Sequence, residues 1–589
     1  YTYSLLYPHR SNSAVVCSIL DECHPLHWHM SMALSLTLAP IFILSGLRDA
    51  PLLGDDGPSL LLDGDEWVAS SSDGVHSIRA TVPGDLITDL ERAGVIKDPL
   101  FNVNWRDQSG TWARPGGWSF TRMFTVAANS SLASANSLLL VLDGVVMAAD
   151  VYVNHNRVSS DGVVDQFLRY EFDIKLHITS GENNLTIHFP LPFSDVRNDE
   201  GRYMACSGGW DWAPFANTTT PSGLPYLSLG IWKSVFLVPV AELSLRYLVP
   251  LVQYQGAYPT APLQDAIAGP WLVNVTAHIT AGSKGAAAGG SFTLTTSLDL
   301  SVVKSVPLAS PLRAGQHHSV NFLIEVPVGA VRLWWPNGVI AARGATQPLY
   351  TITCSYVTKQ GLPAFATTRH IGFRTVALVT DDDSVPGRLA PLSGSGTLTV
   401  RYRVNGASIW ARGSNVIPLD ALAGRADADA LRLHVSSAAA AGFNMLLIWG
   451  GGIYQYEAFY EQADALGLLL YHDLMYSSQQ QSAHMCTRTH TQRHEVVHNV
   501  RRLAGRPSVA VWAGGNEIGG GGVFASFALD IARREDPTRV VWPSSPAAGW
   551  QSGVDRLWGL PNLSEPLRVR LAPPPPPASR VQKGVFYMG

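Results

Sequence analysis

Residues 443–478 read FNMLLIWGGGIYQYEAFYEQADALGLLLYHDLMYSS and contain two short apolar runs on either side of an amphipathic segment. FNMLLIWGGG predicts a strand, residues 454–466 predict a helix, and LGLLLYHDLM predicts a second strand. Nearly continuous apolar strands separated by helices are typical of parallel strands that are buried on both faces. This stretch therefore predicts an α/β region built on a parallel sheet.

The alternation of strand and helix extends in both directions from this stretch. RYRVNGASIWARGSN predicts the first strand with its exit loop, and PSVAVWAGG and RVVWPSS predict the fourth and fifth strands. Helices are predicted for residues 427–442, 490–504 and 524–534. Residues 381–560 therefore predict a (β/α)8 TIM barrel that is incomplete, with about five β/α units. Residues 561–589 predict an irregular tail, because the proline tract LAPPPPPASR cannot continue a sheet.

The residues before this region have a different pattern, of short alternating runs separated by Gly, Asn and Asp. SLLLVLDGVVMAADVYVNHNRV and NLTIHFPLPF are typical of antiparallel strands, and residues 56–240 predict an antiparallel β-sandwich. WLVNVTAHIT, SFTLTTSLDLSV and LYTITCSYV repeat this pattern, so residues 241–380 predict an immunoglobulin-like β-sandwich. The sequence thus predicts a multidomain protein.

The composition is that of a folded chain with several cores. Of its 589 residues, 46% are hydrophobic and 15% are charged, which excludes a disordered tail. The 42 Lys and Arg residues against 46 Asp and Glu residues give a net charge of −4, so we expect no nucleic-acid partner. The 17 Trp and 19 Tyr residues suit the flat faces of sugar rings, although most aromatic residues fill cores.

The first 55 residues predict a leader. The apolar run MALSLTLAPIFILSGL is broken by Pro40 and is shorter than the roughly 20 residues of a membrane span, so it fits a signal peptide better. We therefore expect the secretory route, with a lysosomal, vacuolar or extracellular destination, and no membrane span. The Asn-x-Ser/Thr sequons agree with this route and lie at Asn129, Asn184, Asn217, Asn274 and Asn562.

Polar and aromatic residues follow the predicted parallel strands, where a (β/α)8 barrel builds its active site. They are Arg412 and Asn415 after the first strand, Trp449 after the second, Asp473 after the third, and Asn516 with Glu517 after the fourth. A glycosidase needs a buried carboxyl group such as Glu517 to protonate the leaving oxygen, and Asn516 could bind the sugar 2-OH. The alternative is a helix N-cap Asn followed by a first-turn Glu.

Several segments resemble the β-mannosidases of glycoside hydrolase family 2. VRRLAGRPSVAVWAGGNEI, ending at Ile518, resembles the acid/base segment of that family. GGWDWAP, LWWPNGV with QPLYTITC, and residues 443–478 are similar to the β-mannosidases within it. Residues 66–107 and 403–420 also fit, so the resemblance covers most of the chain. It implies that residues 56–240 are a sugar-binding-like β-sandwich of jelly-roll type.

This resemblance implies a retaining exo-hydrolase that removes terminal β-mannose and needs no metal or organic cofactor. It implies that Glu517 is the acid/base and that Asn516 supports the 2-OH of the sugar. The other residues that it implies as substrate-binding are Trp210, Asp211, Trp212, Trp449 and Asp473. Its substrate would be a β-mannoside oligosaccharide or glycan, and the oligomeric state stays open.

The sequence also departs from the family pattern. His472 and Leu474 flank Asp473 where the family has Gln and an aromatic residue, and Val416 stands where Trp is usual. The nucleophilic carboxylate that the mechanism needs is not found after Glu517, so we expect a chain truncated before it. Two alternatives follow: an inactive sugar-binding fragment, or another activity of the family, such as exo-β-glucosaminidase or β-galactosidase.

A third alternative is a zinc peptidase, because His494, Glu495 and His498 form an HExxH motif on a predicted helix. Eighteen residues separate His498 from Glu517, which resembles the position of the third ligand in gluzincins. In those enzymes the third ligand lies on a helix, however, whereas residues 507–514 predict a strand and a turn. We therefore expect no metal site.

Overall fold

The computed structural model describes most of the chain that follows the predicted leader. The described residues are 60–146, 148–160, 162–190, 204, 229–298, 303–339, 347–379, 401–477, 489–517, 523–542 and 545. All of them belong to one compact unit, Ile43–Gly589. The leader, the WDW segment around Asp211 and the proline tract lie outside the described residues.

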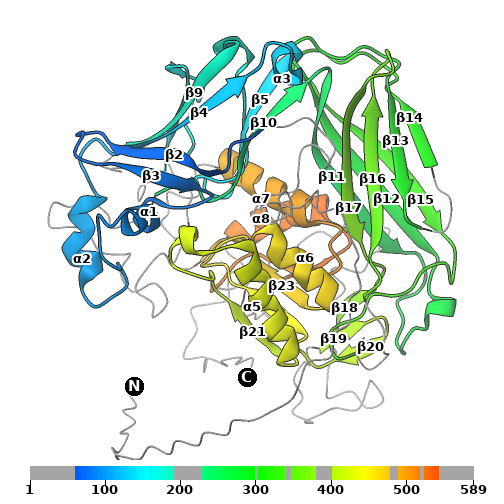
Figure 1. Ribbon diagram of the computed structural model, residues 1–589. Helices are drawn as coiled ribbons and strands as arrows, with labels where there is room; N and C mark the ends of the chain where they lie inside the picture. The colour runs from blue at the N-terminus through cyan, green and yellow to red at the C-terminus, as the bar shows by residue number, and fades with distance from the viewer. Residues whose placement is uncertain are drawn as a thin grey trace, which may run out of the picture. The chain divides into compact units, whose positions relative to one another are not determined.

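The first domain is an antiparallel β-sandwich (Figure 1). One sheet has the order β3-β2-β4-β9-β6-β7 and the other β1-β10-β5-β8. Its strands alternate buried and exposed positions, as in β4, because one face of each sheet packs on the core. The strands are β1 (Leu60–Leu61), β2 (Gly64–Ser71), β3 (Ser77–Val82), β4 (Trp118–Val126), β5 (Ser137–Leu142), β6 (Asp150–Val153), β7 (Asn156–Arg157), β8 (Tyr170–Asp173), β9 (Gly181–Phe189) and β10 (Val235–Val240). The helices are α1 (Leu86–Arg92), α2 (Asn104–Gln108) and α3 (Ser131–Ser134).

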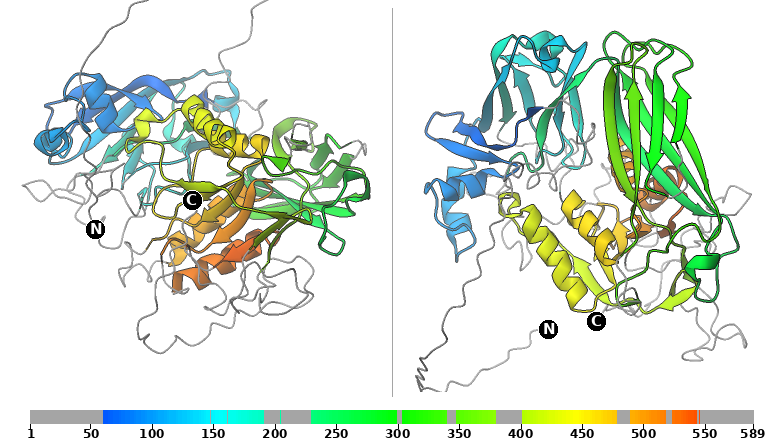
Figure 2. Two further views of the ribbon diagram at one scale, coloured as in Figure 1. Left: turned by 90° about the horizontal axis from the view of Figure 1, so that it is seen from below. Right: turned by 45° about the vertical axis from the view of Figure 1, so that its right-hand side comes forward.

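The second domain is a smaller antiparallel sandwich, whose two green sheets lie face to face in the right-hand view of Figure 2. The sheet orders are β11-β12-β15 and β14-β13-β16-β17. In β12 every second residue is buried along the whole strand, which is the alternation that the sequence showed. The strands are β11 (Leu243–Tyr254), β12 (Trp271–Ala281), β13 (Ser291–Thr296), β14 (Val303–Pro307), β15 (His317–Val326), β16 (Tyr350–Val357) and β17 (Pro363–Ile371).

A small antiparallel sheet follows, and it corrects one prediction. The strands β18 (Val376–Val379), β19 (Arg401–Val404) and β20 (Ala407–Ile409) pair in this order. The RYRVNGASI run is thus a hairpin and not the first parallel strand. Asn405 and Gly406 have φ values of 48° and 80°, the left-handed backbone that a two-residue hairpin turn requires.

The α/β part is a sheet of five parallel strands in chain order, β21-β22-β23-β24-β25. Its first strand begins at Gly413 and not at Arg401 as predicted, so Arg412 precedes β21 and Asn415 lies inside it instead of after its end. The predicted alternation with helices is present in the rest of the region. The strands are β21 (Gly413–Val416), β22 (Met445–Ile448), β23 (Leu469–Asp473), β24 (Val509–Ala513) and β25 (Val540–Trp542), and the helices are α5 (Ala428–Ala440), α6 (Glu457–Leu466), α7 (Thr489–Leu503) and α8 (Val523–Glu535).

Local signals explain where these helices begin and end. The Asp427 side chain accepts a hydrogen bond from Ala430 N at 2.7 Å and so caps α5. Gly467 ends α6 with a φ of 78°, and its amide donates to Ala463 O at 3.0 Å. Among the described residues, none of the helices is both long and apolar enough to cross a membrane.

Buried polar contacts join both sandwiches to the α/β part. Arg374, next to β17, donates to the carbonyl oxygens of Pro507 and Val509 at the start of β24. From the first sandwich, Asp85 caps α1 and also accepts from Gly424 N at 2.7 Å. These contacts fix the α/β part against both sandwiches and therefore help to position its strands.

Candidate active site

The carboxyl ends of the parallel strands bring several predicted residues together. Trp449 directly follows β22, Asp473 is the last residue of β23, and Asn516 and Glu517 follow β24. Beyond the ends of the strands, Asn516 forms parallel bridges to Ser477 on one side and to Ser545 on the other. The predicted edge therefore exists, and it continues past the regular sheet as a short ladder.

Asp473 is a buried carboxyl group that links three strand ends. Its Oδ2 accepts hydrogen bonds from Gly450 N at 3.1 Å and from the Ser545 hydroxyl at 2.6 Å. The side chain is fully buried, and burial raises its pKa to about 7, although the hydrogen bonds from Ser545 and Gly450 favour the charged form. Asp473 thus fixes the segments that follow β22 and β25 relative to β23.

Backbone crowding at this edge explains why glycine follows β22. A Cβ on Gly450 would lie 2.7 Å from Tyr476 O and 3.0 Å from Asn516 N. Gly515 is similar, since its φ is 147° and a Cβ there would lie 2.6 Å from Tyr476 O. Only glycine allows the loops to approach this closely.

Glu517 is the exposed carboxylate of this edge. Its φ is 53°, and its amide donates to Ser545 O at 2.5 Å. The preceding amide, Asn516 N, donates to Tyr476 O at 2.8 Å, and Asn516 itself is half-buried. The two neighbouring strand ends thus hold the backbone of the Asn-Glu pair. The Glu517 side chain is exposed, which corrects the expectation of a buried carboxyl group, because the residue lies beyond the end of β24 and not inside the sheet.

His472, one of the departures from the family pattern, lies beneath this edge in a polar network. Its Nε2 lies 2.8 Å from the Tyr460 hydroxyl, and its Nδ1 lies 2.7 Å from Asp473 O. Burial lowers the pKa of His472 to about 3, so the ring is neutral, with Nδ1 donating and Nε2 accepting. The histidine therefore supports the backbone of Asp473.

Trp449 is buried at this edge, and its amide donates to Val416 O at 3.3 Å. The remaining predicted substrate residues, Trp210, Asp211 and Trp212, lie outside the described residues. The structure therefore brings together Trp449, Asp473, Asn516 and Glu517, and it leaves the WDW segment as a prediction.

The HExxH residues do not form a ligand set. His494 is exposed, whereas His498 is buried with its Nδ1 3.0 Å from the Tyr247 hydroxyl. Glu495 is fully buried and accepts from the Tyr454 hydroxyl at 3.5 Å. No group of three metal-binding side chains occurs within the described residues. The contacts of Glu495 and His498 are those of packing residues between α7 and its neighbours.

Sequence reasoning missed Ser545, which binds Asp473 with its side chain and Gly515 and Glu517 with its backbone. The signal that could have found it is its place just after β25, because the carboxyl ends of parallel strands share one edge.

The comparisons with known proteins agree with this architecture. Residues 67–233 match the family model of the glycosyl hydrolase 2 galactose-binding domain-like domain. The chain is 27% identical to a β-mannosidase of Capra hircus, over 77% of this chain and 49% of that protein. It is 26% identical to β-mannosidase A of Aspergillus fumigatus, over 81% of this chain and 50% of that protein. The chain thus spans about half the length of the curated relatives that it matches.

Two solved structures have a similar fold. A β-D-mannosidase of Dictyoglomus thermophilum has a TM-score of 0.66 at 24% identity, covering 83% of this chain and 58% of that one. An exo-chitosanase of Amycolatopsis orientalis has a TM-score of 0.63 at 19% identity, covering 82% of this chain and 53% of that one. These two structures confirm the multidomain, β-rich fold. The resemblance to β-mannosidases and to glycosyl hydrolase 2 proteins is confirmed by the curated relatives and by the family model.

Proposed function

We propose that this chain carries the general acid/base residue of a retaining exo-glycosidase that removes β-D-mannose from the non-reducing ends of glycans. The observation that carries the proposal is the place of Glu517, an exposed carboxylate fixed at the carboxyl edge of a parallel sheet. The similarity to β-mannosidases supports the choice of sugar. The five parallel strands would be the first five units of a (β/α)8 barrel.

In this proposal Glu517 protonates the glycosidic oxygen as the bond to the leaving group breaks. In the second half of the reaction the same carboxylate removes a proton from the attacking water. Asn516, whose backbone is held by a hydrogen bond to Tyr476, would bind the 2-OH of the sugar. Trp449 and the WDW segment around Asp211 would contribute to the sugar pocket.

The retaining mechanism needs a second carboxylate about 5–5.5 Å from the first as its nucleophile. Asp473 does not meet this need, because it is fully buried and its Oδ2 is bound by Gly450 and Ser545. Glu535 pairs with Arg501 at 2.6 Å on the helices, and Glu565 lies outside the described residues. The nucleophile is thus not assigned, and we give Asp473 the role of positioning the strand ends.

A secretory location is part of the proposal. It is supported by the predicted signal peptide and by the sequon at Asn129, an exposed residue directly before α3. Delivery to the lysosome or vacuole, or release from the cell, would bring the protein to glycan chain ends.

Hydrolysis of aryl β-mannoside by the full chain tests the proposal. Because no nucleophile is assigned, we expect turnover when added azide takes the place of that carboxylate, and Glu517→Gln should lower this turnover by about 10²–10⁴-fold, the usual contribution of a general acid/base. Azide attacks the anomeric carbon as the bond to the leaving oxygen breaks and Glu517 protonates that oxygen, so the products are a mannosyl azide and the free alcohol or phenol. A panel of aryl β-mannoside, β-glucosaminide and β-galactoside decides between the activities of the family.

Glu535→Gln is the matched control, since Glu535 lies on α8 and should leave turnover unchanged. Wild-type turnover that Glu517→Gln leaves intact would remove Glu517 from the mechanism. A chain that binds β-mannosides without hydrolysing them would favour the sugar-binding alternative over the enzyme.

A further inference from the structure

The loop between β21 and α5, residues 417–427, is anchored on the first sandwich. Leu422 is fully buried in the core of that sandwich, together with residues of its strands and of α1. Close to it, Gly424 N donates to Asp85 Oδ2 at 2.7 Å. A loop that begins at the carboxyl edge of the parallel sheet is therefore held by another domain.

Both oxygens of the Asp85 carboxylate take part in this contact. Oδ1 accepts from the amides of Ile87 and Thr88, both at 3.0 Å, and so caps α1. Oδ2 accepts from the Thr88 hydroxyl and from Gly424 N, both at 2.7 Å. Asp85 is only 2% exposed, so water does not replace these donors. One oxygen thus serves the helix, and the other joins the helix to the loop.

The loop approaches α1 closely enough to require glycine. A Cβ on Gly424 would lie 2.9 Å from Asp85 Oδ2 and 2.9 Å from Thr88 Cβ, so a larger residue would push the loop away from the helix. Beside this contact Arg425 pairs with Glu91 at 2.7 Å, but both side chains are partly exposed and such a pair contributes little. The attachment therefore depends mainly on the buried contacts.

The beginning of the same loop lies against the residues that carry Trp449. Trp449 N donates to Val416 O at 3.3 Å. A Cβ on Gly452 would lie 3.1 Å from Pro418 Cδ, so these two residues are in close contact. Gly452 N in turn donates to Trp449 O at 3.0 Å and closes a turn. A shift of residues 417–424 would therefore reach Trp449 through Pro418 and Gly452.

The first sandwich also contacts the loop between β22 and α6 directly. Phe167 and Tyr454 pack edge to face with their ring centroids 5.4 Å apart, and Trp232 packs in the same way on Tyr456 at 5.3 Å. Asn499 of α7 donates to Phe167 O at 2.9 Å and so fixes this segment of the sandwich. The last residues of the β22–α6 loop are therefore held by the first sandwich itself.

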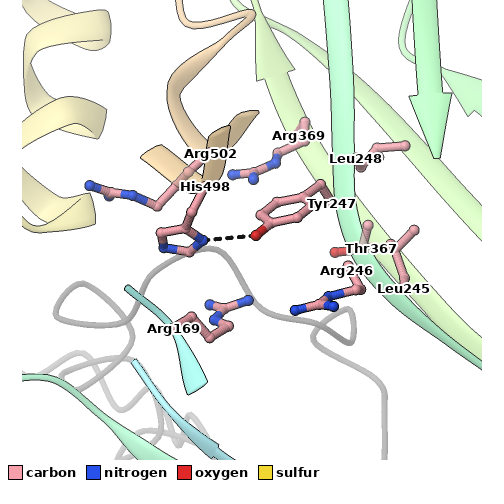
Figure 3. Close-up of a pocket in the computed structure, with 9 residues that line it drawn as sticks. All are labelled: Arg169, Leu245, Arg246, Tyr247, Leu248, Thr367, Arg369, His498 and Arg502. Atoms are coloured by element: carbon pink, nitrogen blue, oxygen red, sulfur yellow. Dashed lines mark hydrogen bonds between the residues drawn. The ribbon is translucent and has the colours of Figure 1, made fainter. Parts of the chain in front are cut away.

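The segment that carries Phe167 continues along α7. Arg169 of this segment lines a small cavity together with His498 and Arg502 of α7 (Figure 3). Arg169 also donates to Asp143 at 2.6 Å, and both side chains are buried. These contacts are separate from the loop on α1, and they should keep the two domains together when that loop is loosened.

We propose that Asp85 is a positioning residue of the candidate active site, acting on Trp449 through the β21–α5 loop. Its carboxylate fixes Gly424, and the loop brings Pro418 against the turn that carries Trp449. The inference rests on the proposed function in one respect, that Trp449 borders the bound sugar. The affinity for the sugar then depends on the first sandwich, whereas proton transfer by Glu517, which lies on another loop, does not.

Asp85→Asn separates the two tasks of this carboxylate. Asparagine caps helices as well as aspartate does, so its Oδ1 keeps the amides of α1. Its Nδ2 replaces the second oxygen, and an amide N–H cannot accept from Gly424 N. Gly424→Ala disturbs the same contact from the side of the loop, because its Cβ would meet Asp85 Oδ2. If one variant fails to fold, the other still tests the proposal.

Fluorine NMR of the full chain labelled with fluorotryptophan reports the surroundings of Trp449, whose resonance is assigned with Trp449→Phe. In both Asp85→Asn and Gly424→Ala we expect this resonance to shift and to broaden relative to the wild type. Ser130→Ala is the matched control, since Ser130 caps α3 in the same sandwich by accepting from Ala133 N at 3.2 Å. It should leave the Trp449 resonance unchanged.

Kinetics give the second readout. In the cleavage of aryl β-mannoside with added azide, either variant should raise KM by about 2–10-fold, the scale of one lost hydrogen bond, and change kcat by less than about twofold. A residue that only supported folding would lower the amount of active protein, and therefore the apparent kcat, with KM unchanged.

This inference and the proposed function fail in different ways. If the wild type does not cleave the mannoside but the Trp449 resonance moves in both variants, the proposed function is wrong and the positioning of Trp449 by Asp85 stands. If the resonance is unchanged in Asp85→Asn and in Gly424→Ala, the inference is wrong, whether or not the wild type is active. A moved resonance with an unchanged KM would remove Trp449 from the sugar pocket and would also overturn the inference.

Discussion

Replacing Asp473 by asparagine should change how the stability of the protein depends on pH. Asp473 is fully buried, its Oδ2 accepts two hydrogen bonds, and its Oδ1 accepts none from the described residues. Burial raises its pKa from the ordinary value of 3.8 to about 7. Asparagine keeps the shape and the Oδ acceptor but cannot become charged.

The direction of the pH dependence follows from the number of protons that the folded and unfolded states bind. Because the folded pKa of Asp473 is the higher one, the native state binds a proton between about pH 4 and pH 7 that the unfolded state has already lost. Its contribution to stability is fully present below about pH 4 and is lost as the pH rises to about 7. The pKa of Asp473 differs by about 3 between the folded and unfolded states, and each pKa unit corresponds to about 1.4 kcal/mol. The free energy of unfolding therefore falls by about 4 kcal/mol over this pH range.

The measurement is the free energy of unfolding of wild type and Asp473→Asn in urea, followed by tryptophan fluorescence from pH 4 to pH 8. The new amide N–H groups cost the variant about 1–3 kcal/mol if they find no partner, but this offset is the same at every pH. As the pH rises from 4 to 8, the free energy of unfolding of the variant should therefore increase by about 4 kcal/mol relative to that of the wild type. Asp65→Asn, a change at an exposed carboxylate, is the control. Parallel curves for wild type and Asp473→Asn, or a difference of the opposite sign, would refute the argument.

Three further changes test the local structure by urea unfolding. Gly467→Ala should destabilise the protein by about 1–2 kcal/mol or more, since Gly467 has a φ of 78° and its Cβ would lie 2.7 Å from Trp335 O; an unchanged midpoint would contradict this cap. Asp427→Ala removes the cap of α5 and should cost about 1 kcal/mol, whereas Asp427→Asn should cost much less. Tyr247→Phe removes the hydrogen bond to His498 and should cost about 1 kcal/mol; a stabilised variant would show that this bond is not formed.

The sequence predicted the parallel strands well where apolar runs are continuous. The strand from Leu469 to Asp473 and the helix that begins near Asp427 lie close to their predicted positions, because burial and capping are local signals. The first parallel strand was misplaced, because the turn at Asn405 and Gly406 was not recognised. The local pattern of apolar residues therefore predicts whether a segment is a helix or a strand. Where that element begins depends on the residues of the turn before it.

Contacts between distant residues could not be predicted in the same way. The hydrogen bond from Ser545 to Asp473 joins residues 72 positions apart. Arg369 and Arg502 approach each other only because two domains pack together. Neither the alternation of apolar residues nor a short motif contains this information. The HExxH motif shows the opposite error, since its spacing is correct for zinc and its Glu495 is buried by neighbours that the motif does not describe.

The backbone conformation of Glu517 distinguishes between a catalytic role and a helix-capping role, which its position in the sequence does not. Its φ of 53° lies in the left-handed region, which costs a residue with a Cβ roughly 1–2 kcal/mol. The structure compensates for this cost with the hydrogen bonds from Asn516 to Tyr476 and from Glu517 to Ser545, and with a glycine immediately before the pair. An N-cap Asn followed by an ordinary first-turn Glu would need no such support. Strain that neighbouring segments maintain is characteristic of functional positions, and it therefore favours the acid/base role of Glu517 over the capping alternative.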